Sequence, residues 1–180
     1  MLQITIPSTE VWDEEKNEFR TTKEYTLQLE HSLVSISKWE SKWKKVFLSK
    51  EEKTYAEVID YIKCMTITQN IPDVAYDCIT KDNVDEIDKY ISSPMTATWF
   101  SNEKAPGVSR EKVTSELIYY WMIALNIPFE CQKWHLNRLL TLIRVCNIKN
   151  TPPKKMSKNA LMRRNAALNA ARRKQFNTTG

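Results

Sequence analysis

The chain of 180 residues contains only two glycines, Gly107 and Gly180. Walker-type phosphate-binding loops and Rossmann-type dinucleotide-binding turns need several glycines, because their backbones approach the phosphates closely. The sequence therefore excludes both of these enzyme classes. Any other backbone position with positive φ must be occupied by a different residue, and Asn126, which follows a long apolar segment, is suited to that conformation.

The composition predicts a folded protein that is not embedded in a membrane. Hydrophobic residues make up 42% and charged residues 27%, and the mean hydropathy is −0.51. The longest apolar run, 117–125, is about half the length that crosses a bilayer. Residues 1–7 lack the basic start and apolar core of a secretory signal. Four widely spaced cysteines favour free thiols in a reducing cytoplasm.

The charges are distributed unevenly along the chain. Residues 1–130 contain all 22 acidic residues and 15 of the 27 Lys and Arg, a net charge of −7. Residues 131–180 contain twelve cations and no acidic residue. Such a division is typical of a protein whose basic end binds an anionic partner or its own acidic body.

The N-terminal third begins with strand patterns. Apolar and polar residues alternate over 2–6, and residues 11–12 and 19–21 flank the polar stretch 13–18, which predicts a hairpin. Alternation returns over 25–29, and this segment either adds a strand or begins the helix that follows. From Ser32 the apolar spacing changes to three or four residues, which predicts a helix.

Helical patterns then continue to the end of the chain. Ser49 and Glu52 match a capping box before a helix that reaches Met65. We predict a further short helix that begins at Asp73 and another from Asp82 to Pro94. Two longer helices follow, one from Ser109 to Leu125 and one from Pro128 to about Cys146. The helix ending at Leu125 is apolar nearly all round, so we expect it at the centre of the domain.

These patterns predict a predominantly helical α+β fold, with a small N-terminal β element packed on five to six helices. We expect a globular domain over residues 1–150, made of a β element (1–30) and a helical core (32–148). A basic tail helix follows in 151–180, after a hinge at Pro152-Pro153. Residues 157–175 favour a helix but contain too few large apolar residues to form a core, so we expect a partner to order this helix.

No recognisable catalytic or metal-binding motif is present. Cys131 and His135 lie four residues apart and would share one face of a helix, but zinc needs three or four protein ligands. The acidic run 82–88 lacks the glycine of a calcium loop, and acids in the first turn of a helix are favoured by its dipole. The sequence therefore predicts a protein that is not an enzyme and that has no metal site and no cofactor.

Three tryptophans are candidate contact residues. Trp39 and Trp43, four residues apart among several lysines, could stack on bases beside phosphate-binding lysines. The alternative is a helix that packs both indoles on the domain while its lysines stay in water. Trp99 lies in the loop-like stretch 92–107 and is the tryptophan that we most expect to be exposed, unless it fills the core.

The tail contains the candidate contact residues Arg163, Arg164, Arg172, Arg173 and Lys174. Arg164 and Arg172, eight residues apart, lie near one face of a helix. Such a segment can follow a phosphate backbone with salt-sensitive and largely sequence-independent affinity. Docking on an acidic protein surface and a purely solubilising role are the alternatives.

Several stretches of the sequence together resemble a family of small tailed-bacteriophage proteins, the siphophage tail assembly chaperones. These stretches are LEHSLVSISKWE (29–40), MTATWF (95–100), IYYWM (118–122) and WHLNRLL (134–140). The resemblance extends over nearly the whole chain, including the basic ending 163–174.

The resemblance implies a protein of the host cell cytoplasm that holds the apolar tape-measure protein in solution and recruits tail-tube protein to it. Trp39, Trp43, Met95 and Trp99 would contact these partners, and the basic tail would act as a tether. Two alternatives stay open. One is a nucleic-acid-binding phage protein that uses the tail and the Trp39/Trp43 face, and the other is a structural head–tail or tail connector.

Overall fold

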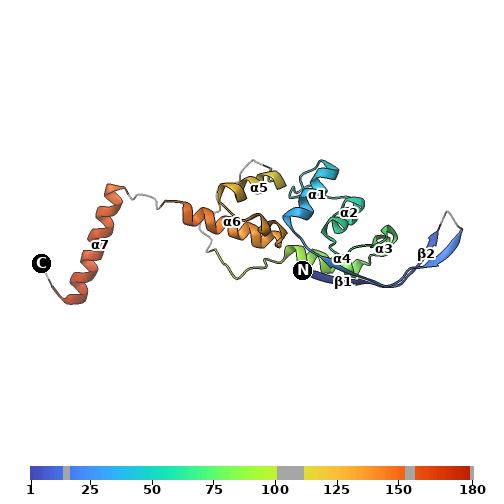
Figure 1. The fold of residues 1–180 in the computed structure, drawn as a ribbon. Helices are drawn as coiled ribbons and strands as arrows, with labels where there is room; N and C mark the ends of the chain where they lie inside the picture. The colour runs from blue at the N-terminus through green and yellow to red at the C-terminus, as the bar shows by residue number, and fades with distance from the viewer. Residues whose placement is uncertain (14–16, 101–111, 153–156, 179–180) are drawn as a thin grey trace. The chain divides into compact units, whose positions relative to one another are not determined.

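The computed structural model describes residues 1–13, 17–100, 112–152 and 157–178, and every structural statement below concerns these residues. They confirm the predicted α+β fold, which is mainly helical (Figure 1). The elements are β1 (Leu2–Ile6), β2 (Glu10–Asp13), β3 (Glu18–Thr21), β4 (Tyr25–Leu29), α1 (Leu33–Trp43), α2 (Tyr55–Met65), α3 (Asp73–Asp77), α4 (Lys81–Ser92), α5 (Ser115–Ala124), the 3₁₀ helix η1 (Phe129–Lys133), α6 (Leu136–Asn150) and α7 (Lys158–Phe176).

The chain divides into two compact units, unit 1 (Met1–Asn147) and unit 2 (Ile148–Gly180). The division falls within the last turn of α6, three residues before the boundary expected from the sequence. Pro152 follows α6, whereas Pro153 lies outside the described residues. No helix among the described residues has both the length and the apolar character needed to cross a bilayer.

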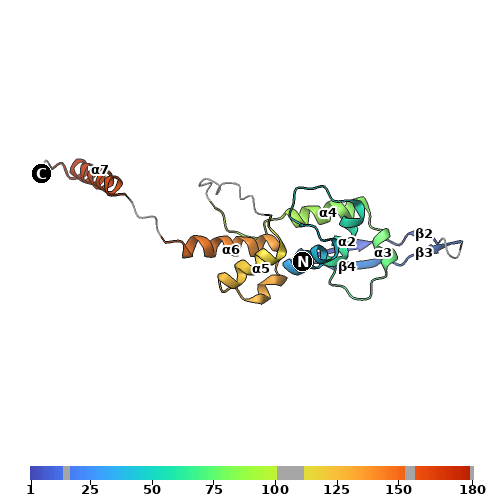
Figure 2. The ribbon, with the colours of Figure 1, turned by 90° about the horizontal axis from the view of Figure 1, so that it is seen from above.

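The N-terminal strands form an antiparallel ribbon. β1 pairs with β4 from Leu2↔Leu29 to Ile6↔Tyr25, and β2 pairs with β3 further out. Between the two pairs, the Thr22 backbone N–H donates to the Thr9 carbonyl at 2.8 Å. Figures 1 and 2 both show β2 and β3 projecting beyond α3. The predicted hairpin is therefore confirmed, and residues 25–29 form a strand and not the start of a helix.

Two capping boxes fix the starts of α1 and α2. Ser32 caps α1, where its hydroxyl accepts a hydrogen bond from the Ser35 N–H. The second box is formed by Thr54 and Glu57, so the predicted box at Ser49 and Glu52 was wrong. The Thr54 hydroxyl accepts from the Glu57 N–H at 3.3 Å, and the Glu57 carboxylate accepts from the Thr54 N–H at 2.7 Å. These bonds place the start of α2 so that it packs against α1.

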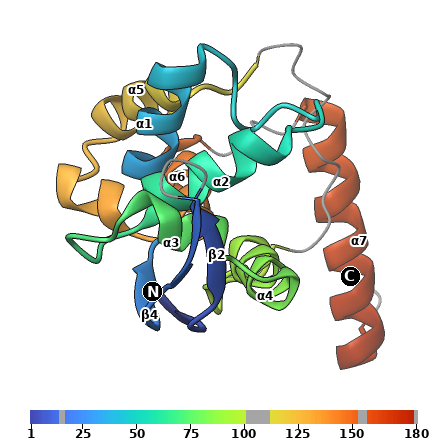
Figure 3. The ribbon, with the colours of Figure 1, turned by 90° about the vertical axis from the view of Figure 1, so that its right-hand side faces the viewer.

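Helix α4 packs against the ribbon. Its N-cap is Thr80, whose hydroxyl accepts from the Asn83 N–H. The Asn83 side-chain amide in turn donates to the Thr5 carbonyl of β1 at 3.3 Å. Ile87 and Tyr90 point inward from the next turns and are buried. Figure 3 shows α4 nearly end-on, beside α2 and the ribbon.

Two helix predictions in the second half of unit 1 were wrong. α5 begins at Ser115 after its N-cap Thr114, whereas Ser109 lies outside the described residues. α5 is also not central, because only one of its faces is buried and Ile123 on the other face is 60% exposed. Asn126 adopts the expected left-handed conformation, with φ of 52°.

The helix predicted from Pro128 to Cys146 is divided into η1 and α6. Residues 134–135 are not helical, because His135 forms an antiparallel β-bridge with Ser32. The Leu136 N–H then donates to the His31 carbonyl at 2.7 Å, so this N–H cannot bond within a helix. The backbone pairing of residues 31–32 with residues 135–136 therefore interrupts the predicted helix.

The buried carboxylate of Glu40 joins α1 to two other segments. One of its oxygens accepts from the Phe47 N–H and the other accepts from the Ser115 N–H, both at 2.8 Å. Ser115 is the first residue of α5, where backbone N–H groups lack helical partners and the helix dipole favours a negative charge. Glu40 therefore fixes both the turn after α1 and the start of α5.

We expect Glu40→Ala to lower the free energy of unfolding by about 3 kcal/mol, because two buried N–H groups would lose their acceptor. Glu52→Ala, at an exposed position of the α1–α2 connection, is the matched control, and we expect it to change stability by less than about 0.5 kcal/mol. Urea unfolding followed by circular dichroism measures both values. Equal stability of the two variants would contradict this role of Glu40.

Candidate functional site

Trp39 is a core residue, and its prediction as a contact residue was wrong. Its side chain is only 1% exposed, and its indole N–H donates to the Glu57 carbonyl at 2.9 Å. The ring stacks on Trp43 with a centroid separation of 6.2 Å and meets the edge of Phe47 at 5.2 Å. The helical spacing that suggested a base-stacking pair instead places Trp39 on the inner face of α1, against α2.

The lysines beside these tryptophans neutralise carboxylates of α2. The Lys45 ammonium donates to the Glu57 carboxylate at 2.5 Å, and this contact, with the Thr54 hydrogen bonds, lowers the pKa of Glu57 to about 2. Lys42 pairs with Asp60 in the same way. These two cations are therefore engaged within the fold, which argues against a phosphate-binding face on α1.

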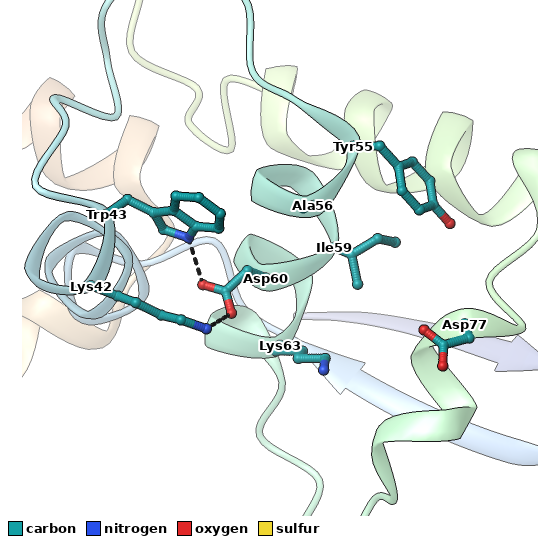
Figure 4. Close-up of a pocket in the computed structure, with 8 residues that line it drawn as sticks. All are labelled: Lys42, Trp43, Tyr55, Ala56, Ile59, Asp60, Lys63 and Asp77. Carbon is teal, nitrogen blue, oxygen red and sulfur yellow. Dashed lines mark hydrogen bonds and ion pairs between the residues drawn. The ribbon is translucent and has the colours of Figure 1, made fainter. Parts of the chain in front are cut away.

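A hollow of about 350 Å³ lies beside Trp43, between the end of α1 and α2 (Figure 4). The Trp43 indole N–H donates to one oxygen of Asp60 at 2.9 Å, and Lys42 donates to the other. Lys63, also in the hollow, donates to Asp73 at 2.6 Å. Lys42, Asp60 and Lys63 are therefore engaged in bonds within the fold, and Asp77 is the remaining charged residue of this lining.

A second, more apolar hollow lies between α2 and α4, with a volume of about 240 Å³. We call it the α2–α4 groove, and its lining residues are Phe47, Lys53, Val58, Tyr61, Ile62, Val84, Ile87, Asp88 and Ile91. Lys53 lies over the Phe47 ring, 4.7 Å from its centroid. Lys53 and Asp88 are the only charged residues of the lining, so the groove is suited to apolar side chains.

The segment 93–100, which follows α4, is held at both ends by α6. The Asn137 side-chain amide donates to the carbonyls of Ile91 and Ser93, at 2.9 and 2.8 Å. The Arg144 guanidinium lies 3.9 Å from the centroid of the Phe100 ring. Asn137 and Arg144 are seven residues apart, two turns of one helix face. Figure 1 shows the chain leaving α4 and passing beside α6.

Trp99 lies within this segment and is 91% exposed. Met95 in the same segment has a φ of 49°, an unusual conformation for a residue with a Cβ, and its side chain is partly exposed. An exposed indole on a segment that is fixed at both ends is typical of a binding contact, because little entropy is lost when a partner covers it. Met95 and Trp99 thus lie on the same exposed segment, and their role as contact residues stays a prediction.

Asn137 and Arg144 were missed as functional residues. Both lie on α6, where Asn137 is half-buried and Arg144 is exposed. Their spacing of two helical turns was the available signal, but it does not show which segment they would hold.

The two histidines are buried and hydrogen-bonded. His31 Nδ1 lies 2.5 Å from the Tyr61 hydroxyl oxygen, and the two imidazole rings are 5.1 Å apart. His135 Nδ1 accepts from the Asn137 N–H, so Nε2 carries the proton and donates to the Tyr90 carbonyl at 3.1 Å. Burial, with repulsion from His135, lowers the pKa of His31 to about 3, and burial also lowers the pKa of His135.

Cys131 and His135 do not form the pair that a continuous helix would give, because Cys131 belongs to η1 and His135 to the bridge with Ser32. Over the described parts of the chain, no group of three His, Cys, Asp or Glu side chains is placed to hold a metal ion. Chemistry at a metal therefore has no support from the described geometry.

Helix α7 in unit 2 carries the five predicted tail cations, Arg163, Arg164, Arg172, Arg173 and Lys174, all of them exposed. The helix is described over its whole length, and none of its residues is buried. Residues 148–180 contain nine Lys and Arg and no acidic residue. By contrast, Lys42 and Lys45 of unit 1 pair with carboxylates of α2.

Comparison with known proteins does not assign the chain to a family. No protein-family model, no curated protein and no solved structure matches it. The surfaces that remain as candidates are the α2–α4 groove with the adjoining segment 93–100, and the basic helix α7.

The histidine pair makes stability dependent on pH. Because folding lowers the pKa of His31 from 6.5 to about 3, its contribution is complete above pH 6.5 and is lost as the pH falls towards 3. For His31 alone, we expect the free energy of unfolding to be about 1.4 kcal/mol lower at pH 5.5 than at pH 7.5. Urea unfolding at both pH values measures this difference.

The control is an NMR titration of the His31 imidazole in the folded protein. We expect no change in its protonation between pH 8 and pH 5. A titration midpoint near 6.5, or a stability that does not change with pH in this range, would show that the buried imidazole is not held neutral by the fold.

Proposed function

We propose that this protein is a non-enzymatic tail assembly chaperone of a tailed phage, which binds the tape-measure protein and tail-tube protein in the host cytoplasm. Its sequence resemblance supports the family. The observation that carries the proposal is the exposed indole of Trp99 on a segment fixed by Asn137 and Arg144, directly after the helix that lines the α2–α4 groove.

A chaperone for an apolar client needs an apolar surface that stays exposed in the free protein. The α2–α4 groove provides partly exposed Val84 and Ile91, and its floor is formed by buried Phe47 and Tyr61. A helix of the client could place its apolar face in this groove, with spacing of three to four residues. Trp99 and the flexible side chain of Met95 would then extend the contact beyond the groove.

This mechanism involves binding without a change of covalent bonds. The two histidines are kept neutral inside the core, and the ionisable groups around Trp43 are paired with one another. Both features fit a protein that binds its partner through a complementary apolar surface. The contact residues of the proposal are thus Met95, Trp99 and the groove, while Trp43 supports α2 and Trp39 lies in the core.

The experiment is co-expression with the tape-measure protein of the same phage. We expect the native chain to keep that protein soluble, and we expect Trp99→Ala and Ile91→Glu each to reduce its soluble fraction severalfold. Ile123→Glu is the matched control, because Ile123 is an exposed isoleucine of α5 outside the groove. We expect this control variant to behave like the native chain.

Thermal unfolding of each purified variant separates a lost contact from a lost fold. Trp99 is almost fully exposed, so its replacement should leave the melting temperature unchanged. If the tape-measure protein aggregates equally with and without the native chain, or if Trp99→Ala and Ile91→Glu both protect it as well as the native chain does, the proposal is wrong.

A further inference from the structure

The hollow beside Trp43 differs in its chemistry from both the α2–α4 groove and helix α7, because aromatic and charged side chains meet in it (Figure 4). Its volume of about 350 Å³ is near the lower end of the range of small-ligand sites, roughly 300–1,000 Å³. As far as the chain is described, it shares no lining residue with the α2–α4 groove. The hollow is therefore a separate site of a size that suits one side chain.

Aromatic and apolar side chains of α1 and α2 border the hollow. Figure 4 shows Ala56 and Ile59 of α2 between Trp43 on one side and Tyr55 on the other. The Trp43 ring is held in place by its hydrogen bond to Asp60. Tyr55 is the first residue of α2 and is 69% exposed, so its ring is free to contact a ligand. Long side chains with a polar head commonly lay an apolar stem on such a surface.

The charges at the hollow do not balance. Lys42 forms an ion pair with Asp60. Lys63 donates to Asp73, a carboxylate just outside the lining, at 2.6 Å. Asp77, an exposed residue at the end of α3, has no hydrogen bond or ion pair of its side chain among the described residues. Three carboxylates thus stand against two ammonium groups, which leaves one negative charge in excess.

This excess charge acts inside the hollow. The pKa of Lys63 is raised, above all by its hydrogen bond to Asp73. The negative charges of Asp77 and Asp60 raise the pKa of Lys63 further. Asp77 therefore lies within electrostatic reach of a group in the hollow, and it favours a positively charged ligand.

The lining disfavours the other classes of ligand. An anionic group would be repelled by the unpaired carboxylate of Asp77. An apolar helix would cover Lys42 and Lys63 and remove two charges from water, which is costly. Of the cationic side chains, arginine fits better than lysine, because its planar guanidinium stacks on an aromatic ring and bonds to a carboxylate with two N–H groups.

We propose that the hollow beside Trp43 binds an arginine side chain of a partner protein. The methylene groups of this arginine would lie on Ala56 and Ile59, while its guanidinium would stack on the Tyr55 ring and bond to the Asp77 carboxylate. Figure 4 shows Tyr55 and Asp77 on the side of the hollow away from Trp43. The inference does not depend on the proposed chaperone activity, because none of these residues belongs to the α2–α4 groove or to the segment 93–100.

The test is an NMR titration of the isotope-labelled full-length protein with a short peptide that contains one arginine among glycines and serines. We expect the backbone signals of the residues that line the hollow to shift, with a Kd in the millimolar range because one side chain makes few contacts. The same peptide with citrulline, which resembles arginine but has no charge, should cause no shift. A lysine peptide should bind about threefold more weakly, since it loses the planar stacking.

Variants of the two proposed contacts give the sharper result. We expect Asp77→Asn to weaken binding of the arginine peptide about tenfold and Tyr55→Leu to weaken it about threefold. The matched controls are Asp85→Asn, an exposed carboxylate of α4, and Tyr120→Leu, an exposed tyrosine of α5. Both controls should bind the peptide within about twofold of the native chain, and the spectra of all four variants show whether the fold is kept.

Four results would each overturn the proposal. They are no shift at the hollow at about 20 mM arginine peptide, equal binding of the citrulline peptide, equal or tighter binding of the lysine peptide, and equal losses in Asp77→Asn and Asp85→Asn. The last result would indicate attraction by the net charge of the protein alone.

Discussion

The carboxylate of Glu40 is the interaction on which the arrangement of unit 1 depends. It accepts one hydrogen bond from the turn that follows α1 and another from the first N–H of α5, so three segments separated by up to 75 residues meet at one buried group. The bond to the Phe47 N–H has a consequence for the surface. It holds Phe47 4.0 Å from Tyr61, ring centroid to ring centroid, and both rings line the α2–α4 groove. The shape of the candidate binding surface is thus set from inside the core.

The same aromatic cluster explains why the histidines are neutral. His31 lies against Phe47, Tyr61 and the second imidazole, and a proton on His31 would place a charge in this apolar environment. Burial also raises the pKa of Tyr61, so its hydroxyl stays protonated and remains a hydrogen-bond partner for His31. Two neighbouring histidines can indicate acid–base catalysis. In this protein they belong to the packed core beneath the groove.

Local features of the fold could be predicted from the sequence, because their causes are local. The alternation of buried and exposed residues over 2–6, the left-handed backbone of Asn126 and the positive charge of the tail each depend on a few neighbouring residues. Features that depend on distant partners could not be predicted. The break before Leu136 needs the carbonyl of His31, and the start of α2 was misplaced because Glu57, which forms the cap, also pairs with Lys45, two residues after the end of α1. The candidate site follows the same division: exposure of Trp99 was expected from its loop, but its fixation by Asn137 and Arg144 requires the tertiary structure.

The two lysine- and arginine-rich segments show how the same sequence signal leads to different outcomes. Near Trp39, Lys42 forms an ion pair with Asp60 and Lys45 forms one with Glu57, both on the neighbouring helix α2. These ion pairs neutralise the two lysines within the fold. In α7, the arginines occur in a stretch of 50 residues that contains no acid, on a helix that buries none of its residues. What distinguishes a structural cation from one that is available to a partner is therefore the presence of a carboxylate on the neighbouring element, and not the density of basic residues.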